Sequence, residues 1–118
     1  MDKGGGKMYS TTLIFILLDF ITGIIKALKE KNLNSTTMRE GLFHKLGSCI
    51  AIFLGILCER SIAYFDIGVN AEVSYCICCY IVLMEIISII ENIGVINPEL
   101  IPQEVQKIFL KLKGGSNN

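Results

Sequence analysis

Three acidic side chains, Asp19, Glu59 and Glu85, lie in stretches of the sequence that are otherwise strongly apolar. A carboxylate in such a setting can bind a proton or a cation, pair with a basic side chain, or line a water-filled passage. Because a charge inside a lipid bilayer is costly, ionisable residues at that depth usually mark a function. The three carboxylates are therefore the first candidates for functional residues.

Further polar side chains share helical faces with these carboxylates. Lys26 follows Asp19 by seven residues, and Ser88 follows Glu85 by three, so each apolar stretch has one polar edge. Lys26 and Glu85 fall at a similar depth and form a candidate ion pair, within one chain or between chains. The side chains predicted to line a pore or to be polar inside the membrane are Asp19, Lys26, Glu59, Arg60, Glu85, Ser88, Glu91 and Asn92.

The elements that carry these residues are long enough to cross a bilayer. The three apolar stretches, Tyr9 to Leu28, Leu46 to Phe65 and Val73 to Ile90, hold 18 to 20 residues each. A hydrocarbon core about 30 Å thick needs about 20 helical residues. The composition agrees, because 52% of the residues are hydrophobic and the mean hydropathy is +0.55. A compact soluble helical protein of this size is the alternative, and it could not hide so much apolar surface.

The predicted fold is an all-α integral membrane protein that forms a single domain over residues 1–118. It has three transmembrane helices, at about 9–31, 37–65 and 73–93, and a C-terminal amphipathic interfacial helix at about 102–113. Thr37 and Glu40 have the spacing of a capping box and are expected to open the second helix. The ends, 1–7 and 114–118, are rich in Gly or Asn and are expected to be flexible.

The distribution of basic residues predicts the orientation of the chain. With three spans, Lys3 and Lys7 lie on one side of the membrane, and eight basic residues lie on the other. Cytoplasmic segments carry the excess of Lys and Arg, so the N-terminus is predicted outside and the C-terminus inside. The first apolar run lacks a small-residue cleavage site and is expected to remain as an anchor. The eight residues are Lys26, Lys29, Lys31, Arg39, Lys45, Lys107, Lys111 and Lys113.

The tail helix and the second span carry two further patterns. In the tail, Lys107, Lys111 and Lys113 lie off an apolar stripe, as in a helix that rests on an anionic membrane surface; packing against a neighbouring subunit is the alternative.

The predicted helix-packing residues are small, which lets helices approach closely. They form either a seam between copies or an internal packing face, and they are Gly23, Gly47, Ala51 and Gly55. Because polar edges do not face lipid comfortably, a homo-oligomer in the lipid bilayer is expected.

Several other functions find no support in the sequence. Cys76 and Cys79 form a C-x-x-C pair, but no second Cys pair or nearby His completes a zinc set, so all five cysteines are expected to be buried packing residues. His44 stands alone and is expected to be an interfacial polar residue. No metal, no cofactor and no catalytic residues are predicted, and the net charge of zero gives no footprint for nucleic acid.

The order and spacing of the polar motifs resemble those of the phage-lysis and toxin-secretion holins of Gram-positive bacteria and their phages. The likeness runs from about Leu18 to Leu112, and the tail holds fewer lysines than holins often have. The motifs are Asp19-x-x-Thr22-Gly23-x-x-Lys26-Ala27, Asn34-Ser35, Gly41-Leu42-x-x-Lys45 and Glu85-x-x-Ser88-x-x-Glu91-Asn92, followed by Pro98 and Pro102.

This resemblance implies a protein of the bacterial cytoplasmic membrane that oligomerises and opens large lesions. An endolysin or a secreted toxin would leave the cell through them, and an antiholin is a possible partner. Two other functions stay open at this stage. A small ion channel or transporter would use the carboxylates to bind protons or cations, and an antiholin-type regulatory membrane subunit would bind a holin without forming pores.

Overall fold

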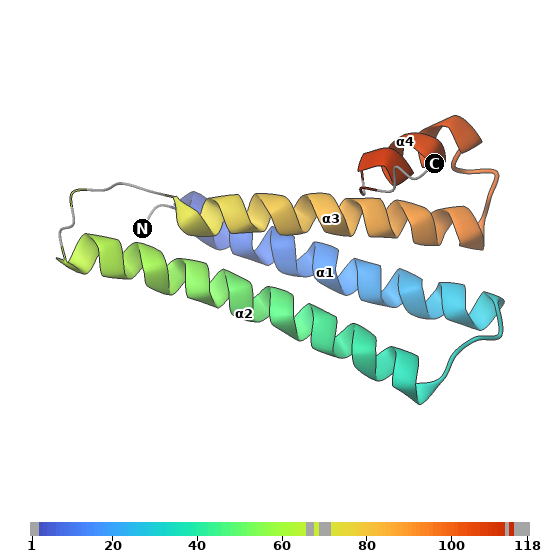
Figure 1. Cartoon of the computed structure of the whole chain (residues 1–118), viewed down its shortest axis with the longest axis horizontal. Helices are drawn as coiled ribbons and strands as arrows, with labels where there is room; N and C mark the ends of the chain where they lie inside the picture. Colours follow the sequence, from blue (N-terminus) through green and yellow to red (C-terminus); the bar gives the residue numbers. More distant parts are fainter. Residues whose placement is uncertain (1–2, 66–67, 69–71, 113, 115–118) are drawn as a thin grey trace.

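The computed structural model describes residues 3–65, 68, 72–112 and 114, and this part of the chain is helical with no strand. The helices are α1 (Lys3–Lys29), α2 (Ser35–Phe65), α3 (Val73–Ile96) and α4 (Gln103–Leu112). The first three helices lie along the long axis of the molecule, and each runs antiparallel to the one before it (Figure 1). α4 folds back beside the C-terminal end of α3.

Local backbone chemistry sets the turn between α1 and α2. Lys31 adopts a left-handed conformation with φ 57°, and the N–H of Asn32 donates to the carbonyl of Ala27 at 2.8 Å. This is the hydrogen bond of a Schellman motif, which ends a helix. The carboxamide oxygen of Asn34 then accepts from the backbone N–H of Thr37 at 2.8 Å. Asn34 therefore caps α2, and the predicted capping box with Thr37 as the cap is wrong by one turn.

The other helix ends differ from the predicted ones by a few residues. α1 begins at Lys3, six residues before the predicted start at residue 9. The flexibility predicted for 1–7 and 114–118 stays a prediction, and residues 1–2 and 115–118 lie outside the described residues. α3 continues to Ile96, three residues past the predicted end, and the N–H of Asn97 still donates to the carbonyl of Ile93 at 2.8 Å. Pro98 explains the stop, because a proline excludes the preceding residue from the helical conformation.

The three long helices form a bundle in which α1 and α3 lie side by side and α2 diverges from them towards its N-terminal end (Figure 1). An apolar cluster joins all three helices, with Ile16 from α1, Ile52 from α2, and Cys78 and Ile81 from α3. Of the five cysteines only Cys78 is fully buried. Cys49 and Cys58 are half-buried, and Cys76 and Cys79 are exposed, so the expectation that all five are buried is wrong.

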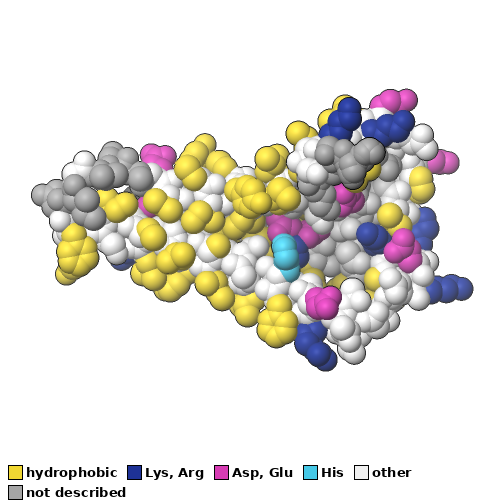
Figure 2. Space-filling view, in the orientation of Figure 1, with side chains coloured by type: hydrophobic (Ala, Val, Ile, Leu, Met, Phe, Trp, Pro, Cys, Tyr) yellow, Lys and Arg dark blue, Asp and Glu magenta, His cyan; other side chains and the backbone are white. Residues whose placement is uncertain are grey.

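The surface of the bundle is suited to lipid. Hydrophobic side chains cover much of its length, whereas charged side chains gather around the α1–α2 connection and α4 (Figure 2). Three helices are long and apolar enough to cross a membrane, over Gly6–Lys29, Ser35–Phe65 and Val73–Ile96. The prediction of an all-α membrane protein with three such helices is confirmed.

Candidate functional site

A lysine from α2 bridges two buried carboxylates, one from each of the other long helices. The Lys45 Nζ atom pairs with Asp19 Oδ2 on α1 and lies 2.8 Å from Glu85 Oε1 on α3. Only 15% of the Lys45 side chain is exposed, compared with 9% for Asp19 and 5% for Glu85. Such charges are stable in a bundle core only when they are paired and hydrogen-bonded, and this bridge pairs both carboxylates at once.

A carboxamide completes the cluster. Asn92 Nδ2 donates to Asp19 Oδ1 at 3.1 Å and to Thr22 Oγ1 at 2.9 Å. The Thr22 hydroxyl in turn donates to the carbonyl of Leu18 at 2.9 Å. In the described part of the chain, every buried side-chain nitrogen or oxygen has a hydrogen-bond partner. We name Asp19, Lys45, Glu85 and Asn92 the polar cluster.

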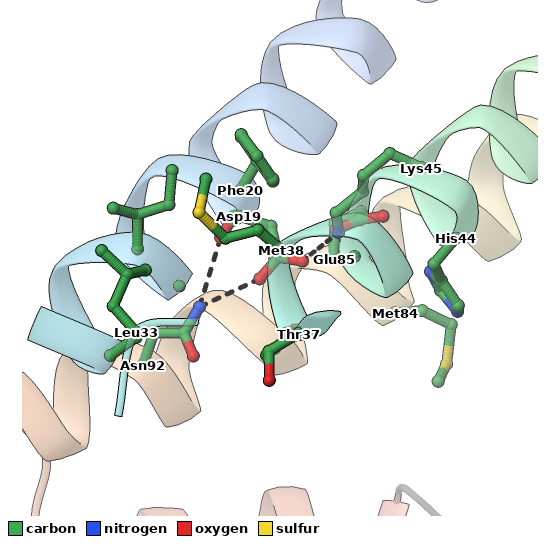
Figure 3. Close-up of a pocket in the computed structure, with 15 residues that line it drawn as sticks. Asp19, Phe20, Leu33, Thr37, Met38, His44, Lys45, Met84, Glu85 and Asn92 are labelled. Carbon is green, nitrogen blue, oxygen red and sulfur yellow. Dashed lines mark hydrogen bonds and ion pairs between the residues drawn. The ribbon is translucent and has the colours of Figure 1, made fainter. Parts of the chain in front are cut away.

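The polar cluster forms one wall of a cavity of about 420 Å³ between α1, α3 and the N-terminal half of α2. Figure 3 shows Lys45 directed towards Asp19 and Glu85, and Asn92 directed towards Asp19. The remaining lining is mostly apolar and also includes the exposed side chain of His44. With two carboxylates and one ammonium group, the ionised cluster has one negative charge in excess.

A second polar contact joins the helices at the opposite end of the bundle. Glu59 Oε2 accepts from the backbone N–H of Ser74 at 2.7 Å and from its hydroxyl at 2.9 Å. Ser74 lies in the first turn of α3, where unpaired N–H groups and the helix dipole favour a negative charge. The Tyr9 hydroxyl lies 2.8 Å from Ser74 Oγ and brings in α1. Glu59 therefore joins α2 to α3 by capping a helix.

A third contact fixes α1 to the other end of α3. Lys29 Nζ donates to the carbonyl oxygens of Val95 at 2.7 Å and Ile96 at 3.0 Å. These carbonyls end α3, where the helix dipole favours a cation. Each end of α3 is thus capped by a charged side chain from a neighbouring helix.

The predicted intramembrane residues separate into two groups. Asp19, Glu85 and Asn92 come together in the polar cluster, and Ser88 lines the adjoining cavity. The remaining predicted residues lie outside the cluster: Lys26 and Glu91 are half-buried, Arg60 is exposed, and Glu59 caps α3.

The predicted ion pair between Lys26 and Glu85 is not the one that forms within the chain. Glu85 pairs with Lys45, which the sequence analysis counted among the loop charges. A pair between Lys26 of one chain and Glu85 of another remains a prediction.

The predicted packing glycines differ in their surroundings. A Cβ atom on Gly55 would meet Ile77 Cδ1 at 2.8 Å and Ser74 Cα at 3.0 Å, so this glycine allows α2 and α3 to approach closely. A Cβ on Gly23 would meet Asn92 Nδ2 at 3.8 Å, whereas one on Gly47 would meet nothing within 4 Å. Ala51 is half-buried. Gly55 is an internal packing residue, and Gly47 is open to a partner outside the chain.

On α4 the described lysines face outward. Lys107 and Lys111 are exposed, as a membrane-surface role requires, and Lys113 lies outside the described residues. The described residues contain no group of three or more His, Cys, Asp and Glu side chains that could hold a metal ion.

Lys45 is the member of the polar cluster that was not among the residues predicted to be polar inside the membrane. It stands directly before the apolar run that starts at Leu46, so its position alone suggested an interfacial charge. The available signal was Gly41-Leu42-x-x-Lys45, one of the motifs that carried the family resemblance. Asp19, Glu85 and Asn92 are covered within one chain and need no second copy to bury them, so the polar edges do not by themselves require self-association.

Comparisons with known proteins place the chain among holins. The sequence matches the model of the bacteriophage holin family over residues 4–114. An uncharacterised 14.9 kDa protein in the nagH 3′ region of Clostridium perfringens is 29% identical over 101 residues, which cover 83% of this chain and 74% of that protein. The uncharacterised protein YqxH of Bacillus subtilis (strain 168) is 29% identical over 118 residues, covering 98% and 81%. No solved structure matches. The chain belongs to the bacteriophage holin family.

Proposed function

We propose that this protein is a holin that oligomerises in the bacterial cytoplasmic membrane and forms lesions through which an endolysin or a secreted toxin leaves the cell. The observation that carries the proposal is the family match over residues 4–114, together with three helices long enough to span the bilayer. The N-terminus lies outside and the C-terminus inside. Lys45 pairs with carboxylates inside the bundle, and the proposed cytoplasmic side still carries the excess of basic residues when Lys45 is left out of the count.

The outer surface of the bundle supports assembly in the membrane. Gly47 is exposed on α2 with open space beside it, so a helix of another copy can approach there closely. On α4, Lys107 and Lys111 are available to the anionic headgroups of the inner leaflet. The proposed partners are further copies of the chain, the lipid bilayer, an antiholin where one is present, and functionally an endolysin or a toxin.

Inducible expression in bacteria tests the proposal. We expect growth to stop abruptly, with release of a folded cytoplasmic enzyme into the medium, because a holin lesion passes whole proteins. A matched control is the same chain with its third span replaced by a polyleucine helix of equal length, made at the same level. Enzyme that stays inside the cells while a small, ion-selective current appears would contradict the proposal and indicate a channel. Delayed lysis on co-expression with a known holin, without lysis alone, would indicate an antiholin.

A further inference from the structure

The two halves of α2 contact the rest of the bundle very differently. In the C-terminal half, a Cβ on Gly55 would meet Ser74 Cα on α3 at 3.0 Å, Ile52 is buried in the apolar cluster, and Glu59 caps α3. In the N-terminal half, the cavity of about 420 Å³ separates α2 from α1 and α3. A Cβ on Gly41 would have Phe20 Cε1 as its nearest neighbour, at 4.0 Å.

Lys45 reaches across this loosely packed region. Its ammonium group bonds to Asp19 and Glu85, and it is the residue through which the N-terminal half of α2 takes part in the polar cluster. The bridge is electrostatic and directional, whereas the contact around Gly55 depends on close packing. α2 is tightly packed in one half, and its other half is held by an ion pair beside a cavity. Such a helix can pivot about its tightly packed half when the ion pair breaks.

We infer that residues 35–48 form an arm that swings away from α1 and α3 about the contact at Gly55, and that the Lys45 bridge holds this arm closed. The inference rests on the proposed function, since the open arm is the state in which the protein builds its lesion. Opening enlarges the cavity and leaves Asp19 and Glu85 without their cation. Two neighbouring carboxylates draw water, so the opened face supplies the polar lining that a water-filled lesion needs.

Spin labels on the full-length protein in liposomes test the motion itself. The labels are attached in a version of the protein whose native cysteines are changed to alanine. One label replaces Phe43 on the arm, which is 64% exposed, and the other replaces Tyr80 on α3, which is 66% exposed. Lys45→Met removes the bridge and is compared with Arg39→Met, which removes one positive charge from an exposed position on the same arm. We expect Lys45→Met to raise the fraction with a long label distance by on the order of tenfold or more, and Arg39→Met to leave it unchanged. Equal label-distance distributions in the two variants would contradict the inference that the Lys45 bridge holds the arm closed.

Lysis timing in cells tests whether the motion belongs to the function. At equal protein levels we expect Lys45→Met to cause enzyme release earlier than Arg39→Met does. If the arm opens in liposomes and the two variants release enzyme at the same time, the link between arm and lesion is wrong. If the unmodified protein releases no enzyme, the proposed function fails, while the label distances still decide whether the arm exists.

A reversible cross-link gives a second test that keeps Lys45 in place. Cysteines at Gly41 on α2 and Phe20 on α1, which both line the cavity, are joined by a short thiol cross-linker that a reductant cleaves. The matched control joins a cysteine at Ile52 to the native Cys78, because these two positions on α2 and α3 already pack in the same apolar cluster. We expect the first link to block enzyme release until the reductant is added, and the control link to allow it. Release in spite of the first link would overturn the inference.

Discussion

Replacing Lys45 with methionine should weaken the folded bundle strongly. Methionine keeps the length and apolar stem of the side chain but cannot bond Asp19 or Glu85. Both carboxylates then remain in a site where 9% and 5% of their side chains are exposed, with no cation beside them. Removing one partner of a buried pair costs more than the pair itself contributes, because the remaining charge is left unsatisfied.

The geometry gives the size of the effect. At the 2.8 Å separation of Lys45 Nζ and Glu85 Oε1, the attraction is about 6 kcal/mol with an effective dielectric constant of about 20. The desolvation of three charges and the repulsion between the two carboxylates offset part of this attraction. Water that enters the adjoining cavity reduces the loss further, so we expect a net destabilisation of about 2–4 kcal/mol. This corresponds to a change on the order of a hundredfold in the unfolding equilibrium.

Equilibrium unfolding of the purified protein in mixed micelles, titrated with a denaturing detergent and followed by circular dichroism, measures this loss. Arg39→Met is the matched control, since it removes a cation from an exposed position on the same helix. Lys45→Met combined with Asp19→Asn and Glu85→Gln removes all the charges of the bridge and should recover part of the stability. The reasoning is refuted if Lys45→Met costs no more than Arg39→Met, or if the triple variant loses as much as the three single variants together.

Three further predictions concern the contacts around the polar cluster. Gly55→Ala should destabilise the bundle by about 1–3 kcal/mol because its Cβ would overlap α3, whereas Gly47→Ala should preserve the folded monomer; detergent unfolding compares the two. Glu59→Gln should lose about 1 kcal/mol through the weaker cap on α3, and Arg60→Gln on the exposed face should show no such loss in the same titration. Lys29→Met should lose about 0.5–1 kcal/mol, and faster amide exchange confined to the last turn of α3 should accompany it. Unchanged exchange there would contradict the capping role.

Elementary sequence patterns were sufficient to predict the helices and the polar edges. Bilayer-length apolar runs predicted the three long helices, although the third ends at Ile96 and not at the predicted residue 93. Asp19, Glu85 and Asn92 were assigned to polar edges from helical spacing, and the structure brings these edges together between α1 and α3. Such features depend on residues near one another in the sequence, so they can be deduced without a tertiary structure.

The partner of the two carboxylates could not be deduced in the same way. Lys45 reaches them only because α2 crosses the α1–α3 pair at a particular angle, and that angle depends on the close approach at Gly55. Spacing on a single helix contains no information about such a crossing. The same reason explains why Gly47 and Gly55, eight residues apart on one predicted stripe, have opposite environments.

The closed bundle poses a physical problem for the proposed formation of lesions. Its polar cluster faces inward, and most of its outer surface is apolar. A ring of rigid copies would therefore expose apolar side chains to the water that fills its lumen, which is unfavourable. In the proposed lesion a polar lining becomes available when the helices of each copy separate during assembly. The loosely packed half of α2 is where separation disturbs the least close packing, and the polar surface that it uncovers is the one that the lumen requires.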